Sequence, residues 1–456
     1  MTQVAIIGGG ITGLAAAWEL HQQGLDFVLL ESAEKLGGKI KTERVDGFII
    51  EGAADSFLAT KPWAWQLCRE IGLGDQLIGT NDYSRNVYVL YNGKLQLFPR
   101  GMRLLVPTDP DGLLESDLLS PEGKQRMLAE TEVSVRDTDE DESLGSFVRR
   151  RFGQEALEVF GQPLLAGIYT GDPEVLSMQA TFPNYLALEK KYGSVIRGTQ
   201  EAVAPPLPPE IPQTAFISLR NGLYQLIEGL QARLAEHIHL NCGVTRIDSD
   251  RTIYTTTGGY FKPDAILLTT PAATAQRLVQ TAAPALASEL AKVRTVSSAT
   301  VVMGFRSEAV TRPLDGFGFV VAGTEDSHLL ASTWHSTKID GRAPAGQVLL
   351  RVFVGGHRQE SDVFLPDEEL IALARREIQP LLGIEAPPVI TRIFRWVDAN
   401  TQYEVGHLGR VAHLRELAPA WLTLAGSPYA GVGIPDCVRQ GRDAAKAIAT
   451  TLMAAS

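Results

Sequence analysis

A strand, a glycine-rich turn and a helix open the chain, and this order constrains the fold more than any other feature. Val4 to Ile7 is an apolar run that predicts a strand buried on both faces. Gly8, Gly10 and Gly13 follow with G-x-G-x-x-G spacing. This spacing permits a sharp turn, a close approach of backbone to a pyrophosphate, and tight packing of helix on strand. Apolar residues at helical spacing over 14–20 complete the pattern, which predicts a βαβ unit that binds a dinucleotide.

A glutamate ends the second strand of this unit. Residues 27–30 are apolar, and Glu31 follows eighteen positions after Gly13. That spacing is close to the ~20 residues typical of the acid that binds the ribose hydroxyls of an adenine dinucleotide. A carboxylate there would repel a 2′-phosphate, which disfavours NADP. The phosphates would lie at the helix N-terminus, where free N–H groups and the helix dipole favour anions.

Composition and charge exclude several classes of function. A chain of 456 residues predicts two or three domains, and the net charge of −11 argues against nucleic acid and against a basic membrane-binding face. No apolar run approaches the ~18 residues of a membrane span, and the first strand leaves no room for a signal peptide. Cys68, Cys242 and Cys437 lie far apart, and the eight histidines show no zinc-type spacing, so we expect reduced thiols, no metal and a cytoplasmic protein.

The rest of the chain predicts a discontinuous α/β domain, an antiparallel sheet and a helical insertion. For the α/β domain, strands are expected at 238–247, 252–256, 265–269 and 421–425. For the antiparallel sheet, they are expected at 299–305, 317–321, 329–333 and 348–355. A hairpin at 86–97 turns at Asn92-Gly93. The nucleotide-binding domain should comprise 1–84, 215–293 and 418–456. The substrate-binding domain should comprise 85–99, 183–214 and 294–417, and the helical domain 100–182.

A second glycine-rich loop, Gly37-Gly38-Lys39, follows the ribose acid. A nicotinamide-binding domain does not require this loop. Together with the first loop and Glu31, it resembles the flavin-binding amine oxidase superfamily, in which such segments hold FAD. That resemblance implies a Rossmann-like domain with FAD as the cofactor.

Longer motifs narrow the resemblance. They are Leu164 to Asp172 (L-L-A-G-I-Y-T-G-D), Tyr192 to Ile196 (Y-G-S-V-I), Gln402-Tyr403 with Gly406-His407, and Gly431 to Cys437 (G-V-G-I-P-D-C). Along nearly its whole length the chain resembles the flavin-dependent protoporphyrinogen/coproporphyrinogen oxidases of haem synthesis, and most of all their soluble bacterial branch. The resemblance implies oxygen-linked oxidation of a porphyrinogen, with coproporphyrinogen III favoured and protoporphyrinogen IX as the alternative.

The resemblance also implies the site. Its FAD contacts would be Gly8, Gly9, Gly10, Ile11, Thr12, Gly13, Glu31, Ser32, Gly38, Lys39, Ala53, Ala54, Asp55, Ser56, Val244, Trp396, Val432, Gly433 and Ile434. Its substrate contacts would be Arg85, which would pair with a propionate, and Gly167. The chain departs from the family pattern at Ala53-Ala54 and Asn400-Thr401, which puts substrate choice in doubt more than fold.

No Ser–His–Asp or paired-carboxylate constellation is evident, so we predict no catalytic side chain, and the flavin would carry the chemistry. Four other residues are weighed. Arg197 is a weaker candidate cation for the substrate and is expected to be structural, and His407 is expected to be a hydrogen-bonded sheet histidine. Cys437 is also expected to be structural, with a lowered pKa at a helix start as the alternative, and Trp396 would wall the flavin pocket. The partners would be a tetrapyrrole and molecular oxygen.

Three other functions stay open: another flavoenzyme of the superfamily, a non-catalytic binder, or a nicotinamide dehydrogenase. Intact glycine loops argue against a non-catalytic binder, and the second loop argues against a dehydrogenase. Oligomeric state and weak peripheral membrane contact through the helical block are left open as well.

Overall fold

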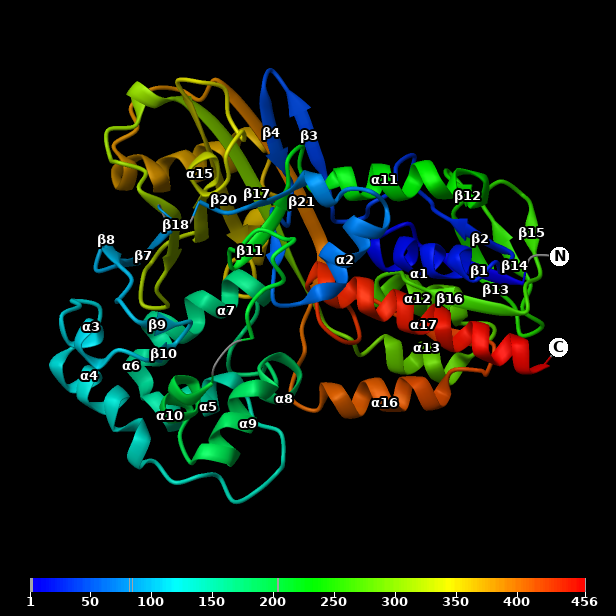
Figure 1. The fold of residues 1–456 in the computed structure, drawn as a ribbon, viewed down its shortest axis with the longest axis horizontal. Helices are drawn as coiled ribbons and strands as arrows, with labels where there is room; N and C mark the ends of the chain where they lie inside the picture. Colours follow the sequence, from blue (N-terminus) through cyan, green and yellow to red (C-terminus); the bar gives the residue numbers. More distant parts are fainter. Residues whose placement is uncertain (1–2, 82, 84, 203–204, 456) are drawn as a thin grey trace.

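The structure, a computed structural model, describes residues 3–81, 83, 85–202 and 205–455. Two lobes meet at a central junction, and the two ends of the chain lie near each other at the outer edge of one lobe (Figure 1). Within the described ranges, no helix is both long and apolar enough to cross a bilayer.

A five-stranded parallel sheet forms the core of the first lobe. Its order is β12-β2-β1-β16-β22, from β1 (Val4–Ile7), β2 (Phe27–Leu30), β12 (Ile238–His239), β16 (Ala265–Leu268) and β22 (Leu422–Leu424). Successive residues of a strand point to opposite faces, so Val4 and Ile6 pack in one apolar cluster while Ala5 and Ile7 pack in another. Burial of both faces explains why these strands are continuous apolar runs.

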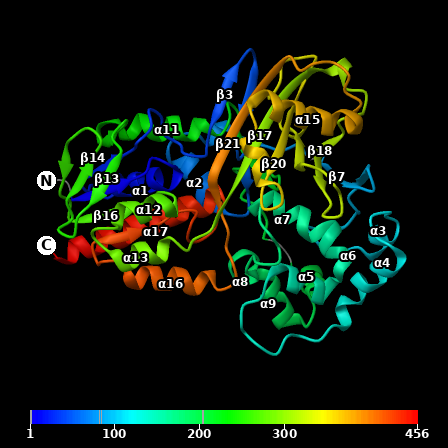
Figure 2. The same cartoon turned by 180° about the vertical axis from the view of Figure 1, so that it is seen from behind.

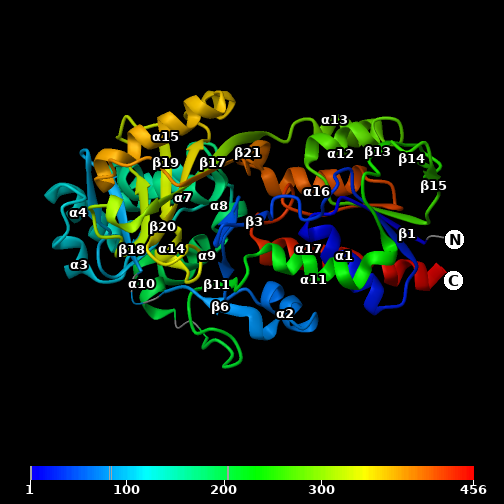
Figure 3. The same ribbon diagram turned by 90° about the horizontal axis from the view of Figure 1, so that it is seen from above.

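Helices cover both faces of this sheet (Figure 3). One face carries α1 (Ile11–Gln22), α2 (Pro62–Glu70), α11 (Tyr224–Leu234) and α17 (Ile434–Ala455), and the other carries α12 (Ala272–Val279), α13 (Pro284–Leu290) and α16 (His407–Leu417). The last helix lies against α1, where Gly441 has no Cβ to obstruct the backbone at Thr12. The two ends of the chain therefore build one α/β unit, as the sequence predicted.

The segment 238–247 is not the single strand that the sequence suggested. Only β12 joins the parallel sheet, whereas β13 (Val244–Ile247) pairs with β14 (Ile253–Thr255), which pairs with β15 (Tyr260–Phe261) in a separate antiparallel sheet. Between β12 and β13, Asn241 adopts a left-handed conformation with φ 52°. This residue turns the chain out of the first sheet.

The second lobe is built on a seven-stranded sheet of order β21-β17-β20-β19-β18-β7-β8, in which only β18 and β7 run parallel. Its strands are β7 (Asn86–Tyr91), β8 (Lys94–Leu97), β17 (Thr295–Arg306), β18 (Gly316–Val321), β19 (Leu329–Trp334), β20 (Gln347–Gly355) and β21 (Ile390–Thr401). The amphipathic helix α15 (Asp367–Leu382) packs its apolar side chains on one face (Figure 2). The short helix α14 (His335–Lys338) follows β19.

A helical block lies beside this sheet. Its elements are β9 (Met102–Arg103), β10 (Val106–Pro107), α3 (Pro110–Leu114), α4 (Pro121–Leu128), η3 (Ala129–Glu132), α5 (Leu144–Phe152), α6 (Gln154–Ala156), the π-helical turn η4 (Leu157–Gly161), α7 (Gln162–Tyr169), α8 (Met178–Thr181), α9 (Pro183–Tyr192) and α10 (Val195–Glu201). The last two helices pack in the apolar cluster of this block, although the sequence grouped 183–214 with the sheet. Residues 203 and 204 of that predicted segment lie outside the described residues.

The remaining short elements lie at the junction of the lobes or within one lobe. They are β3 (Thr42–Val45), β4 (Phe48–Glu51), β5 (Phe57–Leu58), β6 (Leu77–Gly79) and β11 (Phe216–Leu219), with the 3-10 turns η1 (Gly74–Gln76), η5 (Ala235–His237), η6 (Ser307–Ala309) and η7 (Glu360–Phe364). Phe48 and Ile50 of β4 pack against Val302 and Leu349 of the seven-stranded sheet. The junction is therefore a packed connection.

Candidate cofactor site

The first glycine loop presents an uncapped helix N-terminus to open space. Gly10 is the N-cap residue of α1; it makes no side-chain cap, and the first turn contains no acidic residue. A Cβ added to Gly10 would meet no atom within 4 Å, whereas one added to Gly13 would collide with the Gly8 carbonyl. The free N–H groups and the helix dipole at this end suit a pyrophosphate, and the space above Gly10 leaves room for it.

Glu31 lies at the end of β2 beside this loop. Its Oε2 accepts a hydrogen bond from the Gly9 N–H at 2.7 Å, and its Oε1 accepts one from the Ala33 N–H at 2.8 Å. The Cys242 N–H donates to the Glu31 carbonyl at 2.8 Å, and a Cβ on Gly243 would lie 3.2 Å from the Ser32 side chain. The carboxylate is thus fixed at one end of the loop, with the start of β13 and Val244 next to it.

The second glycine loop is hydrogen-bonded to the first. The Gly37 N–H donates to the Gly9 carbonyl at 2.8 Å, and Gly37 forms an isolated β-bridge with Gly10. Lys39 follows, and its Nζ donates to the Ala399 carbonyl of β21. The Lys39 side chain keeps solvent-exposed surface, yet the protein around its ammonium lowers its pKa, with a smaller opposing effect from Cys437. Lys39 therefore links the second glycine loop of the first lobe to β21 of the second lobe.

The segment Gly52 to Ser56 lies beyond the second glycine loop and is held by side chains of the second lobe. Trp396 of β21 donates from Nε1 to the Gly52 carbonyl at 3.1 Å. The Asp55 carboxylate pairs with Lys338 Nζ and Arg351 Nη1, each at 2.8 Å. Burial would raise the pKa of Asp55, but the two cations outweigh that effect and hold the pKa well below its usual range. Asp55 is therefore an ionised structural anchor.

The C-terminal segment completes the site. Val432 and Gly433 are partly exposed, directly before α17 begins at Ile434. In the first turn of α17, Asp436 forms an ion pair with Lys61 at 2.6 Å. The first N–H groups of a helix have no intrahelical acceptor, so this turn offers a second positive dipole end to an anion.

At this end of the site, the structural interpretation of Cys437 holds and the expectation of a sheet histidine at His407 is wrong. Cys437 has no lowered pKa, because burial raises the pKa of its thiol to about 11. His407 is not a sheet residue; it begins α16, stacks on Tyr403 with 4.1 Å between ring centroids, and makes a 3.1 Å hydrogen bond through Nε2 to the Tyr429 carbonyl. Burial lowers the pKa of His407 to about 4, so the residue is a neutral core histidine.

The predicted substrate contacts lie on the second lobe and the helical block. Arg85 is exposed immediately before β7 and makes no hydrogen bond or ion pair with any described residue. Gly167 lies in α7, which packs against β18 and β19, and β18 is the parallel neighbour of β7. Arg197 is exposed on α10. Arg85 is thus free to bind a ligand, whereas its pairing with one remains a prediction.

Sequence reasoning missed the buried charges behind Gly52 to Ser56. They are the buried Glu51, Arg342 and Arg351 and the half-buried Lys338, with the neutral His335 among them. One signal was available: Arg351 interrupts the apolar run of β20, where an unpaired cation would be costly. Its partner Asp55 lies 296 positions away, so the sequence could not name the pair.

Comparison with known proteins agrees with this site. The family model described as "Flavin containing amine oxidoreductase" matches residues 11–449. The coproporphyrinogen III oxidase of Bacillus subtilis is 35% identical, with 97% of this chain and 96% of that protein covered. The Staphylococcus aureus protein of the same name is 33% identical, with 98% and 99% covered.

A solved structure adds the fold. A protein from Exiguobacterium, provisionally named protoporphyrinogen oxidase, superposes with a TM-score of 0.87 at 34% identity and 99% coverage of both chains. The match spans both lobes, which confirms the predicted α/β fold class. The two linked glycine loops, the Glu31 carboxylate beside them and the open helix N-terminus fit FAD. The chain therefore belongs to the flavin-containing amine oxidoreductase family, and its cofactor is FAD.

Proposed function

We propose that this protein oxidises coproporphyrinogen III to coproporphyrin III in haem synthesis, with molecular oxygen as the final acceptor. The observation that carries the proposal is the full-length similarity to two proteins named coproporphyrinogen III oxidase. The absence of a hydrolytic constellation in the sequence is consistent with it, since FAD supplies the hydride acceptor when bound. Three free, buried cysteines accord with the reducing cytoplasm, where we place the reaction.

The chain's own residues would bind and orient the two reactants. The N-terminus of α1 would hold the pyrophosphate, Glu31 the ribose hydroxyls, and Val244 the adenosine end of the cofactor. The segments Gly52 to Ser56 and Val432 to Ile434 would flank the flavin end. Backbone N–H groups at the start of α17 would stabilise negative charge that develops on the ring.

The substrate is a broad apolar ring with carboxylates at its rim. A protein of net charge −11 needs local cations to bind such a molecule. Arg85 is our candidate because its guanidinium is exposed and engages no described residue. A charge-assisted hydrogen bond of this kind is typically worth ~1.5–3 kcal/mol. Gly167 would approach the macrocycle through its backbone.

Protoporphyrinogen IX is the second candidate substrate, favoured by the name of the Exiguobacterium protein. The two substrates differ in that coproporphyrinogen carries two further propionates where protoporphyrinogen has vinyl groups. Steady-state assays with each substrate in air, recording porphyrin fluorescence and hydrogen peroxide, distinguish them. We expect a higher kcat/KM with coproporphyrinogen III, and a preference for protoporphyrinogen IX would reverse the assignment.

A further inference from the structure

The segment Gly52 to Ser56 is fixed by the second lobe, not by its own strand. Beside the Trp396 contact to Gly52, Arg351 donates from Nη2 to the Ala53 carbonyl, and Ser218 Oγ donates to the Asp55 carbonyl at 2.7 Å. Lys338 Nζ bonds Ser56 Oγ at 3.2 Å as well as Asp55. Side chains from β11, α14, β20 and β21 thus hold four of the five residues of this segment.

The charges around this segment do not cancel. Lys338 and Arg351 share the single carboxylate of Asp55, and Arg351 is only 1% exposed. The buried guanidinium of Arg342 lies next to them, and it donates to Ser218 Oγ at 3.0 Å. Glu51 is the other nearby carboxyl, and burial raises its pKa to about 7 despite its hydrogen bonds and the two arginines, so it is only partly ionised near neutrality. The group therefore carries excess positive charge.

Several polar atoms of this group have no protein partner among the described residues. They are both ring nitrogens of His335 and the Nε atoms of Arg342 and Arg351. His335 is fully buried, and desolvation together with Arg351 keeps its pKa well below the usual range, so it adds no charge. Buried groups of this kind are rarely left unpaired in a purely structural network.

The group lies behind the flavin end of the cofactor site. The Gly52 N–H donates to the Lys41 carbonyl at 2.8 Å, and Lys41 lies two residues after Lys39, the last residue of the second glycine loop. The ribose acid Glu31 marks the opposite, adenosine end of the first loop. A dinucleotide whose pyrophosphate lies over Gly10 must therefore extend its flavin toward Gly52 and Trp396.

We propose that Arg351 and Lys338 are positioning residues that fix Gly52 to Ser56 against the flavin and supply the positive charge that raises its reduction potential. Reduction to the anionic reduced flavin would add two electrons and one proton and leave one negative charge, so nearby positive charge would favour that product. The proposal rests on the FAD site and not on the identity of the porphyrinogen.

The test is a reductive titration of the purified, FAD-loaded protein with dithionite against a reference dye. We expect Lys338→Gln and Arg351→Met each to lower the flavin midpoint potential by about 30 mV, a tenfold shift of a two-electron equilibrium. Lys338→Arg should restore the potential because it keeps the charge. The matched control is Arg395→Gln on β21, since Arg395 likewise bonds one carboxylate, Asp367, and two carbonyls, but none in Gly52 to Ser56.

The outcomes separate this proposal from the proposed function. A potential that stays unchanged in both Lys338→Gln and Arg351→Met, with FAD still bound, overturns the role of the two cations whatever substrate the enzyme uses. An equal fall in Arg395→Gln also overturns it, because the shift would then follow from general loss of packing. A lowered potential supports it even if neither porphyrinogen proves to be the substrate. If Arg351→Met does not fold, the Lys338 pair of variants decides alone.

Discussion

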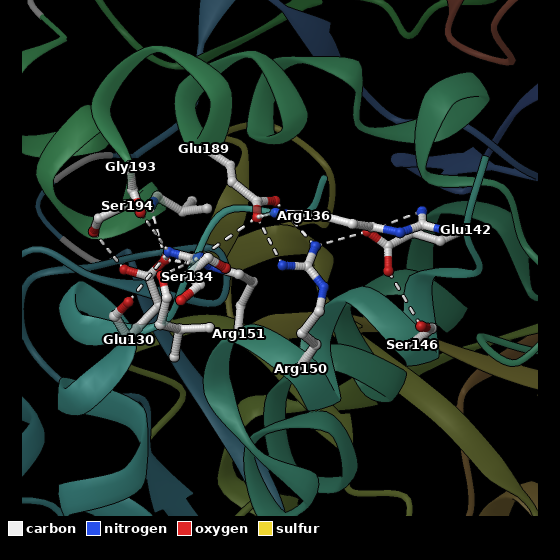
Figure 4. A network of polar contacts seen from close by, with 12 residues as sticks. Glu130, Ser134, Arg136, Glu142, Ser146, Arg150, Arg151, Glu189, Gly193 and Ser194 are labelled. Atoms are coloured by element: carbon white, nitrogen blue, oxygen red, sulfur yellow. Dashed lines mark hydrogen bonds and ion pairs between the residues drawn. The ribbon is translucent and has the colours of Figure 1, made fainter. Parts of the chain in front are cut away.

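Two buried ion clusters, one in the helical block and one behind the cofactor site, differ in how fully their charges are paired. In the helical block, Glu130 and Arg151 are both fully buried and form an ion pair (Figure 4). Behind the cofactor site, Asp55 is shared by Lys338 and Arg351. Both clusters remove charge from water, which is costly unless each group is paired.

The Glu130–Arg151 pair of the helical block is saturated. Glu130 also accepts hydrogen bonds from Ser194 Oγ and from the Val195 and Ile196 N–H groups, at 2.9 and 3.2 Å for the two backbone donors. It thereby caps the N-terminus of α10 with a negative charge, as the helix dipole favours. Arg151 in turn donates to the carbonyls of Val133 and Gly193, at 2.9 and 3.1 Å. Such a cluster ties helices together and leaves no interaction for a ligand.

The cluster behind the cofactor site keeps an excess of cations and several atoms without partners, as described above. The comparison teaches that burial of charge alone does not indicate function. Unbalanced charge next to a candidate cofactor site favours a bound ligand there, because the missing compensation can come from that ligand.

The largest expected effect on stability comes from breaking the Glu130–Arg151 ion pair. Arg151→Met should lower the free energy of unfolding by ~3–5 kcal/mol, because it leaves the Glu130 carboxylate buried without its partner. Chemical denaturation measures this loss, and the flavin potential of the folded variant should not change. Lys190→Met, which removes the exposed ion pair to Asp139 in the same block, is the control and should change stability little. Equal losses in the two variants would contradict the structural role of Glu130 and Arg151.

The next effect tests the open space at the phosphate loop. Gly10→Ala should weaken FAD binding about a hundredfold, or ~2.7 kcal/mol, because the added methyl group occupies the room left for the pyrophosphate. The apoprotein should keep its stability, since the Gly10 Cβ meets no protein atom. Gly409→Ala on α16 is the matched control, as its Cβ is equally free of contacts. Calorimetric FAD titration of both apoproteins measures the difference, and unchanged affinity in Gly10→Ala would remove the loop from the site.

Glu51 gives the unbalanced cluster a pH dependence. Burial raises its pKa from the usual 4.5 to about 7, so between these pH values the folded protein holds a proton that the unfolded chain has lost. This contribution to stability is complete below about pH 4.5 and is lost as the pH rises through 7. Through Glu51, the free energy of unfolding should fall by on the order of 2 kcal/mol between pH 5 and 8, and Glu51→Gln should remove this fall. Denaturation of both proteins across that range measures the difference, and parallel pH profiles would contradict the raised pKa.

The smallest effect concerns an exposed cation. Arg85→Ala should raise KM for the porphyrinogen about tenfold, or ~1.4 kcal/mol, through the lost propionate contact, with kcat little changed. Arg197→Ala, at an exposed position on α10, should leave KM unchanged. An increase in KM for Arg197→Ala alone would transfer the substrate contact from Arg85 to Arg197.

The sequence predicted the parts of the fold that local pattern determines. The βαβ unit, Glu31, the second glycine loop and the closing strand and helix all follow from short motifs whose residues adjoin in the chain. The strand β21 was missed because its residues alternate with arginine, tryptophan and aspartate and form no apolar run. The packing of α9 and α10 was missed because their apolar side chains do not show which core they join.

The residues of the candidate site likewise divide into those that local sequence patterns predict and those that they do not. Residues that act through backbone geometry, such as Gly10 and Gly37, are visible as spacing. Residues that act through tertiary ion pairs, such as Arg351 with Asp55, are not, because no local pattern links two distant positions. At Cys437 a local pattern is misleading. Its place at a helix start allowed a lowered pKa, whereas burial in the core raises the pKa of the thiol.

Anaerobic mixing of the FAD-loaded protein with coproporphyrinogen III tests the central claim most directly. We predict that the visible absorbance of the oxidised flavin falls within a single turnover and returns when oxygen is admitted, with coproporphyrin III as the product. A flavin that stays oxidised with coproporphyrinogen III and with protoporphyrinogen IX would contradict the assignment of this protein as a porphyrinogen oxidase.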